Sequence, residues 1–138
     1  MKTRTTHFLA LAASVLAIGS LHAAPALAGN AALKGQSLDA EAVKAVLLGK
    51  RVSIGDARVV IVIAKDNANQ ESFLQAHVGM TTSQFQNHWR RLFMTGGGSA
   101  PKVVENEAEA VKVAAETPGA VVIADSANAG SLAVLAAN

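Results

Sequence analysis

The sequence predicts an α/β domain with a small, mainly parallel sheet flanked by helices. Two apolar runs rich in β-branched residues, Arg58 to Ala64 and Ala120 to Ala124, lack polar alternation, which is typical of strands buried on both faces. Amphipathic segments with helical spacing precede and separate these runs. Strands that alternate with helices indicate crossover connections, and therefore parallel strands.

The first 28 residues resemble a secretory signal peptide. Lys2 and Arg4 form a positive head, Phe8 to Leu21 is apolar, and Ala26-Leu27-Ala28 offers a cleavage site. A membrane anchor is the alternative, but about 14 apolar residues fall short of the roughly 20 that a spanning helix needs. We expect export to the periplasm with cleavage after Ala28, in preference to Ala23 or Ala24.

Cleavage after residue 28 of 138 leaves 110 residues, 29–138, enough for one small domain. It also removes two of twelve basic residues and none of the ten acidic ones, so the mature chain is neutral. No nucleic-acid partner and no membrane contact after cleavage are therefore expected. The chain has no cysteine, which excludes disulfides, thiol catalysis and thiolate metal sites.

Helix signals divide the rest of the chain. Ser37 is expected to cap a helix that ends at Gly49, after a short polar arm or edge strand over 29–36. Thr81 and Gln84 form a capping box. On the helix that follows, one apolar stripe is expected to face the core; its members are Phe85, Trp89, Leu92 and Phe93.

Later signals complete the pattern. Asn106 and Glu109 predict the start of a helix that runs to Thr117 before the Pro-Gly turn. The small-residue tail is compatible with one more strand. The glycines at 96–98 follow a helix, so they face its carbonyl end and predict a helix stop, whereas phosphate-binding glycine loops precede a helix.

The ordered motifs LLGKR, VGMTTSQFQNHWRRLFMTGGGSAP and VAAETPGAVVIAD resemble the second lobe of the phosphate-binding proteins of ABC transporters. Those proteins belong to the type II periplasmic-binding-protein superfamily. The resemblance is closer still to short, exported, single-lobe relatives, and it covers about residues 37 to 126. It implies a solute-binding, non-enzymatic lobe.

The resemblance also implies where an anion would bind. The family holds its oxyanion with Arg-x-x-Gly-Ser-Gly-Thr-Ser-Phe between a strand and a helix. Aligned on Ser72-Phe73, that motif places Lys65 at the arginine, Asn69 at the serine, Gln70 at the second glycine and Glu71 at the threonine. Lysine lacks the bidentate fork of arginine, and Glu71 would repel phosphate.

The candidate ligand-binding residues are Lys65, Asn67, Asn69, Gln70 and Ser72. Lys65 would supply charge, Asn69 and Gln70 amide donors, and Ser72 a hydroxyl donor. Glu71 would shift the preference from phosphate towards a zwitterion or cation. A single lobe forms only one wall of a cleft, so a partner protein or a second copy would have to supply the other.

Other polar residues predict no chemistry. Ser72, His77 and Asp66 include the residue types of a catalytic triad, but no nucleophile elbow orders them. His77 and His88 do not have the spacing of a metal pair. Arg90 and Arg91 are expected on the solvated side of their helix. No catalytic residue, metal or cofactor is predicted.

Two functions remain open at this stage. The first is an exported solute-binding-like domain, related to the phosphate-binding component of an ABC transporter, with a degraded anion loop. The second is a protein-interaction module, an orphan lobe associated with an envelope sensor or transport complex. Fold-level similarity alone does not decide between them.

Overall fold

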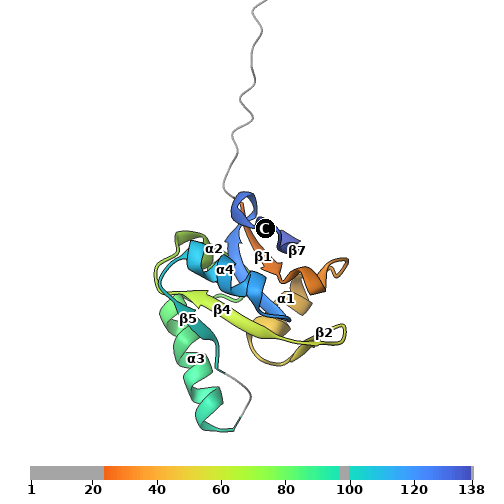
Figure 1. The fold of residues 1–138 in the computed structure, drawn as a ribbon. Coiled ribbons are helices and arrows are strands. Elements are labelled where there is room, and N and C mark those ends of the chain that lie inside the picture. The colour runs from red at the N-terminus through yellow and green to blue at the C-terminus, as the bar shows by residue number, and fades with distance from the viewer. Residues whose placement is uncertain (1–23, 97–99, 138) are drawn as a thin grey trace, which may run out of the picture.

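The computed structural model describes residues 24–96 and 100–137 (Figure 1). The strands are β1 Pro25–Gly29, β2 Ser53–Ile54, β3 Ala57–Arg58, β4 Val60–Ala64, β5 Lys102–Val104, β6 Ala120–Asp125 and β7 Ala133–Ala137. The helices are α1 Ala40–Leu47, α2 Ala68–His77, α3 Thr82–Met94 and α4 Glu107–Glu116, with short 3-10 turns η1 Ala31–Leu33 and η2 Ser126–Asn128.

Five of the strands form one mixed sheet in the order β5-β4-β6-β1-β7. β4 pairs in parallel with both β5 and β6, whereas β1 is antiparallel to β6 and β7. Four of the five strands therefore run in one direction. The α/β class with a mainly parallel sheet flanked by helices is confirmed.

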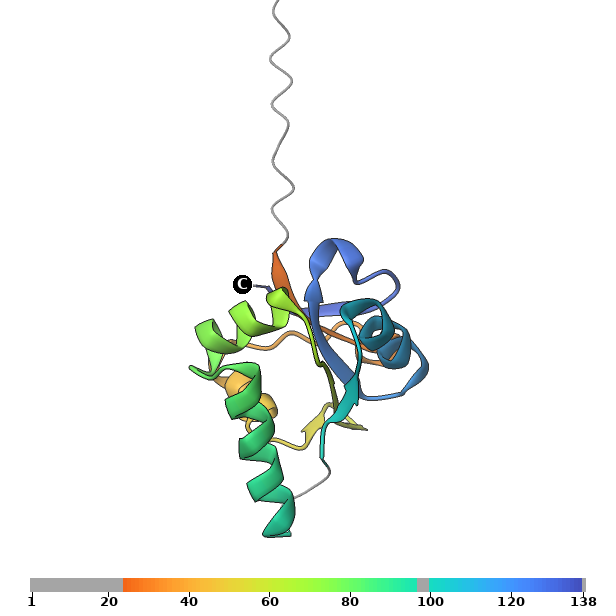
Figure 2. The same cartoon turned by 90° about the vertical axis from the view of Figure 1, so that its left-hand side faces the viewer.

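The two faces of the sheet carry two separate hydrophobic cores. Alternate residues of a strand point to opposite faces. Ile61 and Ile63 pack with α1, α2 and α3, whereas Val62 and Ala64 pack with Ala110 and Ala114 of α4. Figure 2 shows α4 on one side of the sheet and the other three helices opposite. The chain thus leaves β4 and β5 towards opposite faces.

Helix α3 binds the end of α1 through its buried aromatic side chain. The indole Nε1 of Trp89 donates to the backbone oxygen of Leu47 at 2.9 Å, and Nε2 of His88 lies 3.0 Å from the oxygen of Leu48. These contacts satisfy carbonyls that the end of a helix leaves without an intrahelical partner. Gly49 follows with φ +81°, and the Trp89 ring lies where a Cβ would stand. Glycine is therefore required there.

Several expected boundaries shift. Asp39 caps α1 in place of Ser37, because its side chain accepts from the backbone N–H of Ala42. The capping box at Thr81 and Gln84 is confirmed. The prediction that Phe93 belongs to the apolar stripe facing the core is wrong, because this residue is 58% exposed. Helix α3 extends beyond the sheet at its C-terminal end, so this last turn has no core beneath it (Figure 1).

The N-terminal segment changes the domain boundary. The expected arm or edge strand at 29–36 is instead preceded by β1, which lies inside the sheet between β6 and β7. Leu27 is fully buried. Cleavage after Ala28 would remove four of the five residues of this strand. The folded domain therefore starts by Pro25, and the expected leader up to residue 23 lies outside the described residues.

Candidate functional site

A cleft opens at the carboxyl ends of the parallel strands. Its volume is about 780 Å³, and it lies between the first turns of α2 and α4. The lining residues are Asp66, Asn67, Ala68, Asn69, Asn106, Glu107, Ala108, Val111 and Asn128. Neighbouring strands whose following helices go to opposite faces form the usual ligand-binding crevice of α/β sheets. We refer to this site as the carboxyl-edge cleft.

The two asparagines of the predicted loop are held by neighbouring groups. Asn67 caps α2, because its Oδ1 accepts from the backbone N–H of Gln70, and its Nδ2 donates to the oxygen of Ile123 at 3.2 Å. The Nδ2 of Asn69 donates to Oε2 of Glu107 at 3.3 Å. Both side chains reach the cleft, as predicted for a binding loop, but their bonds tie elements of the domain together.

Gln70 has a structural task that its sequence position did not indicate. Its side chain is fully buried, with Oε1 accepting from the N–H of Ala64 and Nε2 donating to the oxygen of Ala64, both at 2.9 Å. The ladder between β4 and β6 ends at Val62, so the amide of Gln70 takes the place of a missing strand partner. This amide is not available to a ligand, contrary to its expected role as a donor.

Glu71, a residue of α2, binds the start of the following helix. Its Oε2 accepts from the backbone N–H of Thr82, at the first residue of α3, at 2.9 Å. Hydrogen bonds from the Thr82 side chain and backbone lower the pKa of the Glu71 carboxyl. The carboxylate is therefore bound to the start of α3, and Glu71 also lines a smaller pocket beside Asn67 and Ala68 at the start of α2. Ser72, the last of the predicted ligand residues, is exposed.

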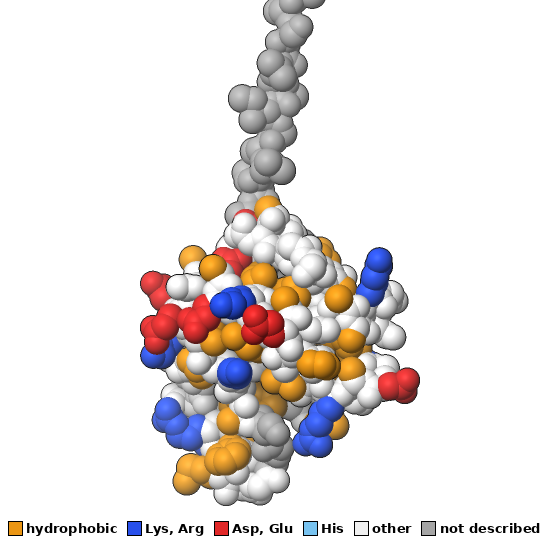
Figure 3. All heavy atoms as spheres, in the orientation of Figure 1, with side chains coloured by type: hydrophobic (Ala, Val, Ile, Leu, Met, Phe, Trp, Pro, Cys, Tyr) orange, Lys and Arg blue, Asp and Glu red, His pale blue; other side chains and the backbone are white. Residues whose placement is uncertain are grey.

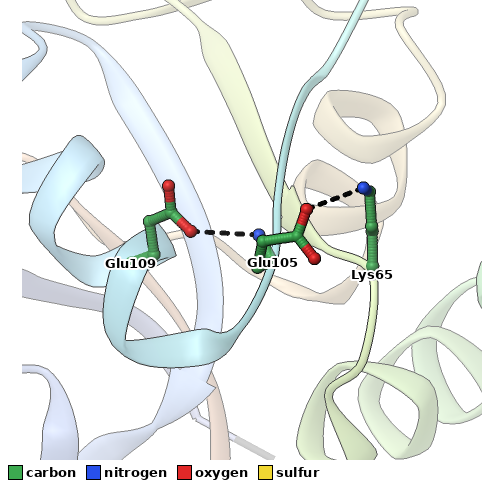
Figure 4. A network of polar contacts seen from close by, with 3 residues as sticks. All are labelled: Lys65, Glu105 and Glu109. Atoms are coloured by element: carbon green, nitrogen blue, oxygen red, sulfur yellow. Dashed lines mark hydrogen bonds and ion pairs between the residues drawn. The ribbon is translucent and has the colours of Figure 1, made fainter.

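Lys65, the predicted anion-binding cation, already has a carboxylate partner. Its Nζ lies 2.7 Å from Oε1 of Glu105, and this hydrogen bond raises the pKa of the lysine. The backbone N–H of Glu105 in turn donates to Oε2 of Glu109, so the three residues form a chain from β4 to α4 (Figure 4). An anion at Lys65 would have to displace Glu105.

The charge of the carboxyl-edge cleft is negative. Asp66 and Glu107 are the two ionisable residues that line it, and neither is basic. Figure 3 shows acidic side chains gathered over the end of β5 and the start of α4. Phosphate would therefore meet like charge. Among residues 24–96 and 100–137, however, no group of three or more His, Asp or Glu side chains is placed to hold a metal ion.

Sequence reasoning missed the residues that follow β5 and β6. Glu107 connects the cleft walls, because its Oε1 accepts from the backbone N–H of Asp125 while its Oε2 accepts from Asn69. The sequence predicted only the start of a helix here, from Asn106 and Glu109. The signal that could have found it is topological: residues after parallel strands meet at one edge of the sheet.

The fold and site define a single-lobe α/β domain with a carboxyl-edge cleft. No protein-family model matches the chain, and no curated protein matches it. In the part of the chain that the structure describes, none of the helices has the length and apolar character needed to cross a bilayer.

Proposed function

We propose that the chain is an exported, non-enzymatic binding domain that acts by contacting a protein partner. The observation that carries this proposal is the internal use of the predicted ligand groups. Lys65 is paired with Glu105, Gln70 with Ala64, and Asn69 with Glu107. A site that recognises a solute needs polar groups aimed at the ligand, whereas these groups hold the lobe together.

The open, acidic character of the carboxyl-edge cleft supports the same proposal. Binding proteins that hold a small solute tightly bury most of its surface. A lobe of this size with an open, acidic cleft would leave phosphate half exposed and next to Asp66 and Glu107. An open cleft that holds a solute poorly does not prevent the surface of the folded domain from binding another protein.

The test is a ligand screen combined with crosslinking in the cell. The folded chain should show no rise in melting temperature with phosphate, sulfate, a phosphonate or amino acids. A photo-crosslinking residue placed in turn at exposed surface positions should give one reproducible protein adduct from a limited set of positions. A stabilisation by phosphate that Lys65→Ala abolishes would instead overturn the proposal.

A second candidate is a solute-binding-like domain for an amino-bearing solute. The acidic lining of the carboxyl-edge cleft favours it, because Asp66 and Glu107 are its two ionisable residues and Asn128 adds an amide. Amino acids should then raise the melting temperature while phosphate does not. Asp66→Asn should remove that rise, and Lys65→Ala should leave it intact. No response to any amino compound would exclude this candidate.

A further inference from the structure

A second groove runs between α3 and the edge strand β5. Its volume is about 490 Å³. Five of its nine lining residues have large apolar side chains: Ile63, Trp89, Phe93, Pro101 and Val103. The others are Lys65, Gln86, Arg90 and Ala100. We refer to it as the α3–β5 groove. It lies apart from the carboxyl-edge cleft, and the two share none of their lining residues.

Large apolar side chains are exposed at this groove. Phe93 is 58% exposed, Met94 next to it 78%, and Val103 on the facing strand 45%. Figure 3 shows apolar and basic side chains together on the lower part of the molecule, where α3 projects. Single exposed apolar residues are ordinary, but a group of them around a groove marks a site of interaction.

The backbone of β5 has one open side in the part of the chain that the structure describes. There β5 lies at the end of the sheet and pairs only with β4. The oxygen of Val104 accepts from the N–H of Lys65 at 2.8 Å, so Val104 presents its backbone groups to β4. Because these groups alternate in direction along a strand, the N–H and C=O of Val103 point to the open edge. An extended segment could pair with this edge by strand addition.

The charge of the groove selects the kind of segment. Two cations and no carboxylate line it. Lys65 is already paired with Glu105. Arg90 donates a hydrogen bond to the neutral side chain of Asn87, and none of the residues that line the groove offers it a carboxylate. A second copy of this chain would bring the same cation to the same place, which disfavours a symmetric pair.

We propose that the α3–β5 groove binds an extended, acidic and apolar segment of a partner protein. The segment pairs with the backbone of Val103, places an apolar side chain against Trp89 and Phe93, and directs a carboxylate to Arg90. This inference rests on the proposed function, since it names the surface and the chemistry of the partner.

The test uses two capped nonapeptides, Val-Thr-Glu-Thr-Val-Thr-Glu-Thr-Val and the same sequence with lysine in place of glutamate, so that the apolar and the charged side chains lie on one face of the added strand. Fluorescence anisotropy should give binding of the glutamate peptide, with the lysine peptide at least about tenfold weaker. Arg90→Glu should reverse this preference. Val103→Pro should reduce binding about tenfold or more without loss of folding, because its N–H faces the open edge and proline is tolerated there.

Val134→Asp is the matched control for Val103→Asp. Val134 lies on the opposite edge strand, β7, and is 47% exposed. The Val103 variant should lose binding, and the Val134 variant should keep it. Equal loss in both variants, or no preference for the glutamate peptide, would overturn the inference.

Sedimentation of the chain alone tests whether a second copy of the chain occupies the groove. A dimer that Val103→Pro dissociates would assign the groove to a second copy and overturn the peptide proposal. A cellular crosslink that survives Val103→Asp and Arg90→Glu would likewise overturn it, while the proposed function would stand on another surface.

Discussion

The carboxylate of Glu107 binds the backbone N–H of Asp125, with 2.6 Å between Oε1 and the nitrogen. Glu107 is the first residue of α4, and Asp125 is the last residue of β6. The second oxygen, Oε2, accepts from Asn69 in the first turn of α2. One side chain therefore connects the end of one element, β6, with the starts of two others, α4 and α2, at the position where a bound anion would otherwise be expected.

Glu107→Ala should therefore destabilise the domain by about 2 kcal/mol, because hydrogen bonds to charged acceptors contribute more than neutral ones. Urea unfolding followed by circular dichroism measures this change. Glu116→Ala, at the exposed C-terminal end of the same helix, is the control and should change the free energy of unfolding by less than about 0.5 kcal/mol. Equal effects in the two variants would contradict the assigned role of Glu107.

Gln70→Ala should lower the free energy of unfolding at least as much as Glu107→Ala. The substitution leaves the N–H and C=O of Ala64 buried without their partners, and each such group costs about 1–3 kcal/mol. Ser72→Ala, on the same helix but exposed, should be close to neutral. A Gln70 variant as stable as the parent would show that water or a shift of β4 replaces the amide.

The fold class could be predicted because its signals are local. The apolar runs that became β4 and β6 needed only composition, and the capping box at Thr81 needed only four residues. β1 was missed for a related reason. Its sequence, Pro25–Gly29, has the small residues of an export signal, and only pairing with distant β6 and β7 makes it a strand.

The candidate site was harder to predict because it depends on strand order. The loop after β4 could be located by its polar residues, but not what those residues contact. Gln70 is polar and follows a strand, as a ligand donor would, yet it binds Ala64 because β6 diverges from β4 beyond Val62. Such a gap in a ladder leaves no trace in the local sequence.

The lowered pKa of Glu71 should make the stability of the domain vary with pH in the acid range. Hydrogen bonds from the side chain and backbone of Thr82 lower the pKa of Glu71 below the ordinary value of 4.5. The ionised Glu71 carboxylate therefore stabilises the folded state above pH 4.5. This stabilisation is lost as the pH falls through the lower pKa that Glu71 has in the folded state. Glu71→Gln lacks the charge, so its deficit against the parent should be largest near pH 7 and should shrink by pH 3.

Carbon-13 NMR titration of the Glu71 carboxyl measures the same effect directly. Thr82→Val removes the hydroxyl donor and should move the pKa of Glu71 back towards 4.5. A titration at or above 4.5 in the parent chain would contradict the contact between Glu71 and Thr82.

Trp89→Phe tests the contact between α3 and α1. The variant keeps an aromatic ring in the core but removes the indole donor to the oxygen of Leu47, so that carbonyl is left buried without this partner. We expect a loss of about 1–3 kcal/mol in the free energy of unfolding. Arg91→Ala, exposed on the same helix, should have almost no effect. A neutral Trp89→Phe variant would contradict the role of this hydrogen bond.

The position of β1 predicts where the expected leader would be cut. Cleavage after Ala28 would delete residues that pair with β6 on one side and β7 on the other, including the fully buried Leu27. We therefore expect processing after Ala23 or Ala24, which leaves the strand intact. Intact-mass measurement of the exported protein locates the cut. A chain that starts at Ala24 should unfold cooperatively in urea, and one that starts at Gly29 should not fold, because its sheet would lack the strand between β6 and β7. An exported product that starts at Gly29 and unfolds cooperatively would contradict this expectation, since β6 and β7 would then have to close on each other.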